Sequence, residues 1–316
     1  AAADWTVVTM RANVVRAYYG GVLAVDKVRT LEQAEQAANA AVRQVQSMLQ
    51  QGLVTKADAL QASVRTTDVT AQLLSARNDV ITAQQQLGML LGRTDGTLPL
   101  LPDALPSDSV VRRLAERDTM VVGATSLAID RADVRAAIAG VRAASSDRQR
   151  AAATMLPRLN SFARFDWNAP RGLFAGRKNW TVGLMASWSL FGGGSELADL
   201  AGATARATGA TAGAQAARMQ SSLEADAARR GVVVALQRLA LAEQSNAQSR
   251  EAHRLVEKRY AGGLATIAEL LGAEATATGS ALAHAAARYA LIDALATHRR
   301  ASGADPAELS LLEGAR

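Results

Sequence analysis

Few residues in this chain have the types and spacing that catalysis or metal binding requires. The 316-residue sequence holds no cysteine, which excludes disulfides and thiolate metal sites. Of its three histidines, His284 and His298 lie two heptads apart on one predicted helix, too far to share a metal ion. His253 has no ligand spacing with either of them or with a carboxylate. We therefore predict no metal site, no cofactor and no enzymatic activity.

One glycine-rich stretch, SLFGGGSEL at residues 189–197, has the setting of a dinucleotide-binding loop, between a predicted strand and a predicted helix. Gly192 and Gly194 match the first two glycines of that fingerprint, but Leu197 occupies the position of the third. No second strand follows to complete a strand–helix–strand unit. A tight strand-to-helix corner explains these glycines better.

A more specific spacing is an internal repeat. The stretch QQGLVTKADALQA at residues 50–62 aligns with AGGLATIAELLGA at residues 261–273, with a constant offset of 211. The offset continues without a gap to Gly92 and Gly303. The matched residues at the two turns are Gly52, Leu53 and Thr55 in the first copy and Gly263, Leu264 and Thr266 in the second. The chain therefore contains two copies of one unit, a long helix, a Gly-Leu turn and a second long helix.

Acidic residues occupy the same position in both copies, Asp58 after the first turn and Glu269 after the second. Two interpretations fit them. They are first-turn acids favoured by the helix dipole, or they line a pore. Tyr260, before the second turn, is by itself most simply a packing residue.

Long helices must position these turns, because proline is absent from residues 1–98 and 171–305. One helix is expected over residues 195–261, about 100 Å long at 1.5 Å per residue. Apolar and small residues recur in alternating steps of four and three, which predicts a heptad seam in each copy. The seams are Leu53, Ala57, Leu60, Val64, Thr67, Ala71, Leu74, Asn78 and Ile81, and then Leu264, Ala268, Leu271, Ala275, Thr278, Leu282, Ala285, Tyr289 and Ile292.

The composition agrees with closely packed helices. Hydrophobic residues make up 49% of the chain but aromatic residues only 4%, and alanine dominates the hydrophobic set. The formal charge is +6, with lysine and arginine spread along the helical stretches. That distribution favours solvated helix faces over a nucleic-acid surface.

Residues 159–191 have a different pattern, with period two in their second half. One face is apolar and comprises Trp180, Val182, Leu184, Ala186, Trp188 and Leu190, and the other is small or polar. Two strands of about ten residues with aromatics near their ends match a transmembrane β-hairpin facing lipid. A half-buried hairpin on a soluble sheet is the alternative. It would lack a partner, because no other strand pattern occurs and two strands alone are barely stable.

Several motifs in order resemble the TolC-like outer membrane efflux protein family. They are RYAGGLAT at the second turn, LPRL before the strands, WTVGLMASWSLFGGG after them, and IDRADVRAA at residues 129–137. The resemblance implies a mainly α fold with one transmembrane β-hairpin and two repeats of long antiparallel coiled-coil helical hairpins. These would form part of a homotrimeric α-barrel/β-barrel channel.

The implied organisation has five segments. Residues 1–98 and 195–303 are the helical-hairpin repeats of a periplasmic tunnel, 99–156 the connector and equatorial-type helix, 157–194 the outer-membrane hairpin, and 304–316 the tail. Ala1 aligns with Ala212 by the offset, inside the helix after the hairpin. The resemblance therefore implies an N-terminally truncated copy, with a first helix and first hairpin upstream.

The family also implies a function: a passive exit duct of a tripartite efflux or type I secretion system in the Gram-negative outer membrane. Its partners would be a periplasmic adaptor, an inner-membrane pump and outer-membrane lipid, with no nucleic acid. The two turns would dock the adaptor. The alternative function is a soluble periplasmic coiled-coil adaptor or scaffold without a channel.

Three residues match family positions at the tunnel entrance. Tyr260 and Asp58 correspond to residues that tie helices together and hold the entrance shut, and Glu269 to an acidic ring in the lumen. Two positions depart from the family pattern: Ala265 replaces the usual arginine, and Gly272 replaces a second acid.

Overall fold

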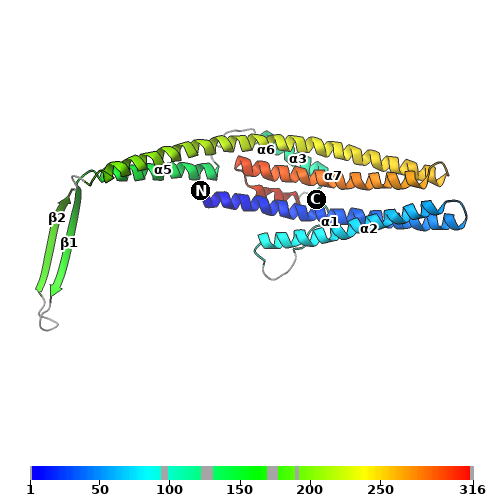
Figure 1. Ribbon diagram of the computed structural model, residues 1–316, viewed down its shortest axis with the longest axis horizontal. Coiled ribbons are helices and arrows are strands. Elements are labelled where there is room, and N and C mark those ends of the chain that lie inside the picture. Colours follow the sequence, from blue (N-terminus) through cyan, green and yellow to red (C-terminus); the bar gives the residue numbers. More distant parts are fainter. Residues whose placement is uncertain (1, 94–98, 122–130, 169–176, 189–191, 314–316) are drawn as a thin grey trace. The chain divides into compact units, whose positions relative to one another are not determined.

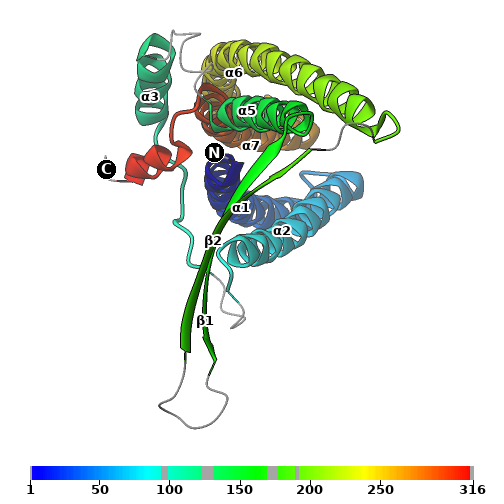
Figure 2. The same ribbon diagram turned by 90° about the vertical axis from the view of Figure 1, so that its left-hand side faces the viewer.

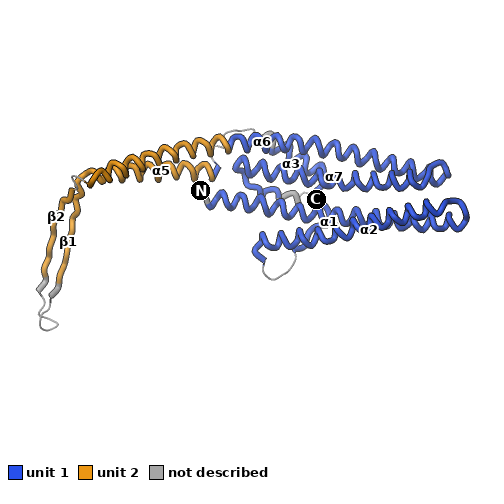
Figure 3. The backbone as a smooth tube through the Cα atoms, in the orientation of Figure 1, with its two compact units in different colours: residues 1–132, 221–316 blue, residues 133–220 orange. Residues whose placement is uncertain are grey.

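The computed structural model of the chain describes residues 2–93, 99–121, 131–168, 177–188 and 192–313 (Figure 1). The chain divides into two compact units (Figure 3). The first comprises residues 1–132 and 221–316, and the second comprises residues 133–220.

Long helices dominate the described residues. They are α1 (Ala2–Gln50), α2 (Lys56–Leu90), α3 (Asp108–Val121), α5 (Ala132–Ala153), α6 (Ser195–Ala261) and α7 (Ile267–Ser302), followed by the 3-10 helix η1 (Pro306–Glu313). The 67-residue helix α6 has the predicted bounds, because the segment contains no proline and is rich in alanine. No helix, over the part of the chain that the structure describes, is long and apolar enough to cross a lipid bilayer.

In the first unit, α1 packs between α2 and α7 (Figures 1 and 2). The largest core cluster joins α1, α3, α6, α7 and η1, and includes the fully buried Val22, Val111, Leu239, Leu291 and Leu295. A second cluster joins the helix ends around Tyr260. The small core side chains allow the helices to approach closely, as the alanine-rich composition indicates.

The predicted heptad seam is buried in part of α7, whereas in α2 it is wrong as a contact within the chain. Leu271, Ala285 and Ile292 of the α7 seam are buried. In α2, the seam residues Leu60, Val64, Leu74 and Ile81 are exposed, and Ala62, Val69, Leu73 and Ala76 are buried instead. The reason is geometric, because α1 covers a different stripe of α2 and leaves the seam stripe exposed.

The second unit contains the predicted strand hairpin. Strands β1 (Arg158–Asn168) and β2 (Arg177–Ser187) pair antiparallel, from Arg158 opposite Ser187 to Asn168 opposite Arg177. Phe165 lies opposite Trp180, with ring centroids 4.9 Å apart.

Phe162 interrupts the alternation of apolar residues in the sequence, and the pairing explains why. It lies opposite Gly183, and its ring occupies the space of a side chain there. A Cβ atom at Gly183 would lie 2.6 Å from the Phe162 ring, so any larger residue would require the ring to move.

Candidate functional site

The two helical tips have the same backbone geometry. Gly52 and Gly263 adopt the left-handed conformation, with φ of 71° and 70°. The amide of Leu53 donates to the carbonyl of Met48 at 2.9 Å, and the amide of Leu264 donates to that of Arg259 at 2.8 Å. This is the Schellman motif, which requires a residue that tolerates positive φ at the glycine position.

Only one glycine of the Gly262–Gly263 pair is required by the turn. Gly262 has no positive φ, and a Cβ atom there would make ordinary contacts, 3.6 Å from the Lys258 carbonyl oxygen. Its counterpart in the first repeat is Gln51. The conformational requirement therefore falls on Gly263, as it does on Gly52.

The helix that follows each tip begins with a capping box. The Asp58 amide donates to the Thr55 hydroxyl at 3.2 Å, and the Thr55 amide donates to the Asp58 carboxylate at 2.8 Å. Thr266 and Glu269 make the same pair of bonds at 3.2 and 3.0 Å. Hydrogen bonds from the Thr55 backbone and then its side chain lower the pKa of Asp58. Both acids thus act as helix caps.

Each tip presents one large apolar side chain to solvent. Leu53 and Leu264 directly follow the left-handed glycines and are 66% and 72% exposed. An exposed leucine at the point of chain reversal adds nothing to the core of its own chain. Its apolar surface is available to a partner.

Tyr260 joins the two tips. Its ring is buried in the second core cluster with Val45, Ala62, Ile267, Leu270 and Leu271. Its hydroxyl donates to the Met48 sulfur at 3.6 Å, which links the end of α6 to the end of α1. Burial, and then the charge of Asp58, raises the pKa of Tyr260. Asp58 is therefore close enough to act electrostatically, while its carboxylate bonds to Thr55.

The strand hairpin presents an uncovered apolar face within its own unit. Val182 and Leu184 are 76% and 82% exposed, and Trp180, Ala186 and Trp188 on the same face are also exposed. Trp188 follows the end of β2, and its indole nitrogen donates to the Met155 carbonyl at 3.1 Å. The predicted lipid-facing Leu190 lies outside the described residues.

A model of the outer membrane efflux protein family matches residues 1–93 and 125–304. The chain belongs to the outer membrane efflux protein family. This membership confirms the predicted family, and the structure confirms the predicted mainly α fold with long helical hairpins and one β-hairpin. Homology to outer-membrane efflux channels supports an outer-membrane channel role. A search of curated proteins finds no match.

Solved structures of outer-membrane channels have the same fold. The outer-membrane channel OprN matches 95% of this chain and 67% of its own, with 23% identity and a TM-score of 0.80. The outer membrane protein VceC of Vibrio cholerae matches 95% and 71%, with 23% identity and a TM-score of 0.79. The MtrE outer membrane channel of Neisseria gonorrhoeae, in its open state, matches 96% and 68%, with 18% identity and a TM-score of 0.79.

Two residues near the tips of this efflux-family chain were missed by sequence reasoning. Glu274 is 7% exposed, and its Oε1 has no hydrogen-bond partner among the described residues. The buried Nε of Arg65 also has no hydrogen-bond partner among them. Burial raises the pKa of Glu274, and Arg65 and then His253 partly oppose that shift. The available signal was the repeat, which has Ser63 at the equivalent position. Within the described part of the chain, no cluster of three or more metal-ligating side chains occurs.

Proposed function

We propose that this chain is a subunit of a homotrimeric outer-membrane channel, the passive exit duct of a tripartite efflux or type I secretion system. The observation that carries the proposal is the uncovered apolar face of the strand hairpin around Val182 and Leu184, within the second unit. An apolar strand face of this length suits contact with lipid. The protein would lie in the Gram-negative outer membrane with a long periplasmic extension.

The exposed stripe of α2 supports assembly with other copies of the chain. By the repeat, α2 corresponds to α7 and α1 corresponds to α6. The stripe of α7 is covered by α1 within the chain. The equivalent stripe of α2, around Leu60 and Leu74, would be covered by α6 of a neighbouring copy. Such a head-to-tail contact gives a cyclic oligomer when the rotation between neighbouring copies closes a ring, as the proposed trimer requires.

The tips carry the proposed contacts with partner proteins. Leu53 and Leu264, with the turn residues Gly52, Thr55, Gly263 and Thr266, would meet a periplasmic adaptor that connects the channel to an inner-membrane pump. Tyr260 would hold the entrance shut by fixing one tip against the other, with Asp58 contributing charge. Glu269 would supply an acidic ring in the lumen that favours cations.

The test is charge placement on the hairpin of the full-length protein. Val182→Arg with Leu184→Arg should abolish assembly in the outer membrane, because arginine on a lipid-facing strand costs about 2–4 kcal/mol at the bilayer centre. The matched control, Thr181→Arg with Met185→Arg, changes the opposite face and should assemble. Assembly is measured by outer-membrane fractionation and by the yield of oligomer. Normal assembly of the first variant would favour a soluble periplasmic scaffold.

A further inference from the structure

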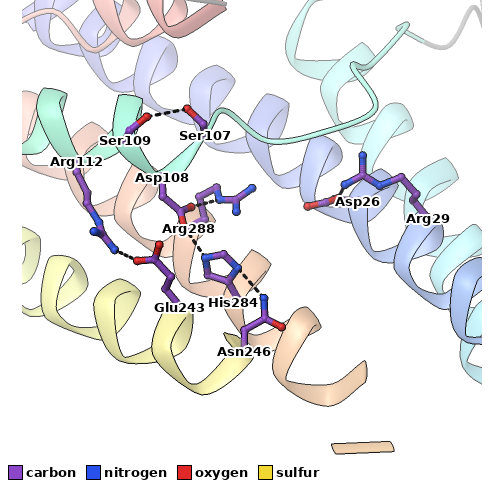
Figure 4. A network of polar contacts seen from close by, with 10 residues as sticks. All are labelled: Asp26, Arg29, Ser107, Asp108, Ser109, Arg112, Glu243, Asn246, His284 and Arg288. Atoms are coloured by element: carbon purple, nitrogen blue, oxygen red, sulfur yellow. Dashed lines mark hydrogen bonds and ion pairs between the residues drawn. The ribbon is translucent and has the colours of Figure 1, made fainter. Parts of the chain in front are cut away.

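Helix α3 lies against the second helical repeat through polar contacts at its N-terminal end (Figure 4). The Asp108 carboxylate accepts hydrogen bonds from Nε2 of His284 at 2.7 Å and from Nε of Arg288 at 2.5 Å, both on α7. One turn further along, Arg112 forms an ion pair with Glu243 of α6. Val111 and Ala115 of the same helix are fully buried in the largest core cluster.

The internal repeat shows what the second hairpin would do without α3. The offset of 211 relates Glu32 and Arg77 to Glu243 and Arg288. In the first repeat these residues pair directly, with Arg77 donating to Glu32 at 2.9 Å. In the second repeat, Glu243 and Arg288 each form an ion pair with a residue of α3. Among the described residues, no ion pair joins Glu243 directly to Arg288. Helix α3 therefore binds both residues whose counterparts in the first repeat pair with each other.

A third position shows that the second repeat is adapted to α3. His284 corresponds to Leu73, which is buried in the core between α1 and α2. In the second repeat a core leucine is thus replaced by an imidazole that reaches Asp108 with one nitrogen. Its other nitrogen lies 3.4 Å from the Asn246 side-chain nitrogen.

The two ends of α3 are held with different strength. At the C-terminal end, Arg299 binds Asp118 with two hydrogen bonds of 2.5 and 2.8 Å, and their side chains are 5% and 6% exposed. At the N-terminal end, the Arg112 and Glu243 side chains are 33% and 50% exposed, and those of Asp108 and Arg288 are 16% and 17% exposed. Breaking a buried pair leaves uncompensated charges, whereas exposed partners return to water at little cost. The ion pairs of the N-terminal end are therefore less buried than that of the C-terminal end, which makes the N-terminal end the more weakly held of the two.

We propose that the N-terminal half of α3, residues 108–115, is a releasable clip on the second hairpin. The clip undocks by exchanging its two ion pairs for a direct pair between Arg288 and Glu243, while Asp118 and Arg299 stay bound. Neither hairpin charge is left unpaired in the released state, and the direct pair offsets part of the cost of exposing Val111 and Ala115, so the released state is a minor population of the folded protein. Release separates residues 108–115 from α6 and from the middle of α7, and it gives the second hairpin the side-chain pairing of the first.

The experiment measures amide hydrogen exchange in α3 of the purified full-length protein. Asp108→Asn with Arg112→Gln should accelerate exchange over residues 109–115 by about tenfold, because the docked state loses both ion pairs. Residues 116–121 should change less. The control is Glu32→Gln with Arg77→Gln, which removes the direct pair of the first repeat and should leave α3 unchanged. Unchanged exchange over residues 109–115 in the first variant would overturn the clip.

A charge reversal separates the ion pair from a general packing effect. Arg112→Glu places like charges together and should release the clip, and adding Glu243→Arg should restore its protection. Failure of this rescue would overturn the role of the pair.

The exchange of partners has its own test. In the Asp108→Asn, Arg112→Gln background, adding Glu243→Gln with Arg288→Gln should accelerate exchange in α7 over residues 284–292 further, because the new direct pair is lost. If amide exchange over residues 284–292 is not accelerated further, the proposed direct pair between Arg288 and Glu243 does not form. An effect of clip release on single-channel conductance is expected only if the proposed channel function is correct. The amide hydrogen exchange measurements test the clip whether or not the protein is a channel.

Discussion

The two helical repeats of the first unit have matching tips and different flanks. Gly52 and Gly263 differ by one degree in φ, and the same capping box follows each. Yet Leu60 is 58% exposed, whereas its counterpart Leu271 is 8% exposed. Turn geometry depends on a few neighbouring residues, so repetition of the sequence reproduces it. Burial depends on which helix lies alongside, and that differs between the repeats.

The two repeats differ most clearly in the burial of Leu60 and Leu271. Leu271→Ala should lower the free energy of unfolding by about 2–4 kcal/mol, because it leaves a cavity in the core around Tyr260. Leu60→Ala should change the stability of the single chain little, while it weakens oligomer formation if α2 meets a second copy. Denaturant unfolding and the oligomer fraction on size exclusion measure the two effects. Equal losses of chain stability would contradict the difference in burial.

The glycines test whether the tips are equivalent. Gly52→Ala and Gly263→Ala should each destabilise by about 1–2 kcal/mol, because alanine is strained at positive φ. Gly262→Ala should instead stabilise by about 0.5–1 kcal/mol, since it improves helix propensity without a close contact. Thermal unfolding of the three variants checks the order. Destabilisation by Gly262→Ala would show that the turn needs both glycines.

The capping threonines should behave alike. Thr55→Ala and Thr266→Ala each remove the side chain that accepts the N3 amide, so each should cost about 1 kcal/mol. Local amide exchange at the start of α2 and α7 reports the loss. A large difference between the two would mean that tertiary contacts, and not the cap, fix one of these helix starts.

The smallest effect concerns Glu274, which has Ser63 as its counterpart. Burial raises its pKa in the folded state above the ordinary value of 4.5, so the folded protein retains the proton to higher pH than the unfolded chain does. The resulting stability is present below that ordinary value and is lost as pH rises through the folded-state pKa. Glu274→Gln should therefore stabilise by roughly 0.5–1 kcal/mol at neutral pH. The gain should vanish in acid, as unfolding at several pH values will show, and a gain that persists in acid would exclude titration as its cause.

Local features of this fold could be predicted from the sequence. The bounds of α6, the strand hairpin and the reversal at Gly52 and Gly263 follow from proline positions, period and glycine chemistry, which act within a few residues. The buried stripe of α2 could not be predicted, because two apolar stripes compete for α1. The contacts of α3 with His284 and Glu243 join residues more than a hundred positions apart, and no local pattern records them.

The packing of Phe162 over Gly183 has a consequence for how the hairpin forms. A slip of one residue would place the Phe162 ring against Val182 or Leu184, whose side chains fill the space that glycine leaves empty. The same slip would turn every side chain of one strand to the opposite face. This aromatic–glycine pair therefore acts as a register key. In this register Leu159, Ala163 and Phe165 of β1 share one face with Trp180, Val182, Leu184 and Ala186 of β2.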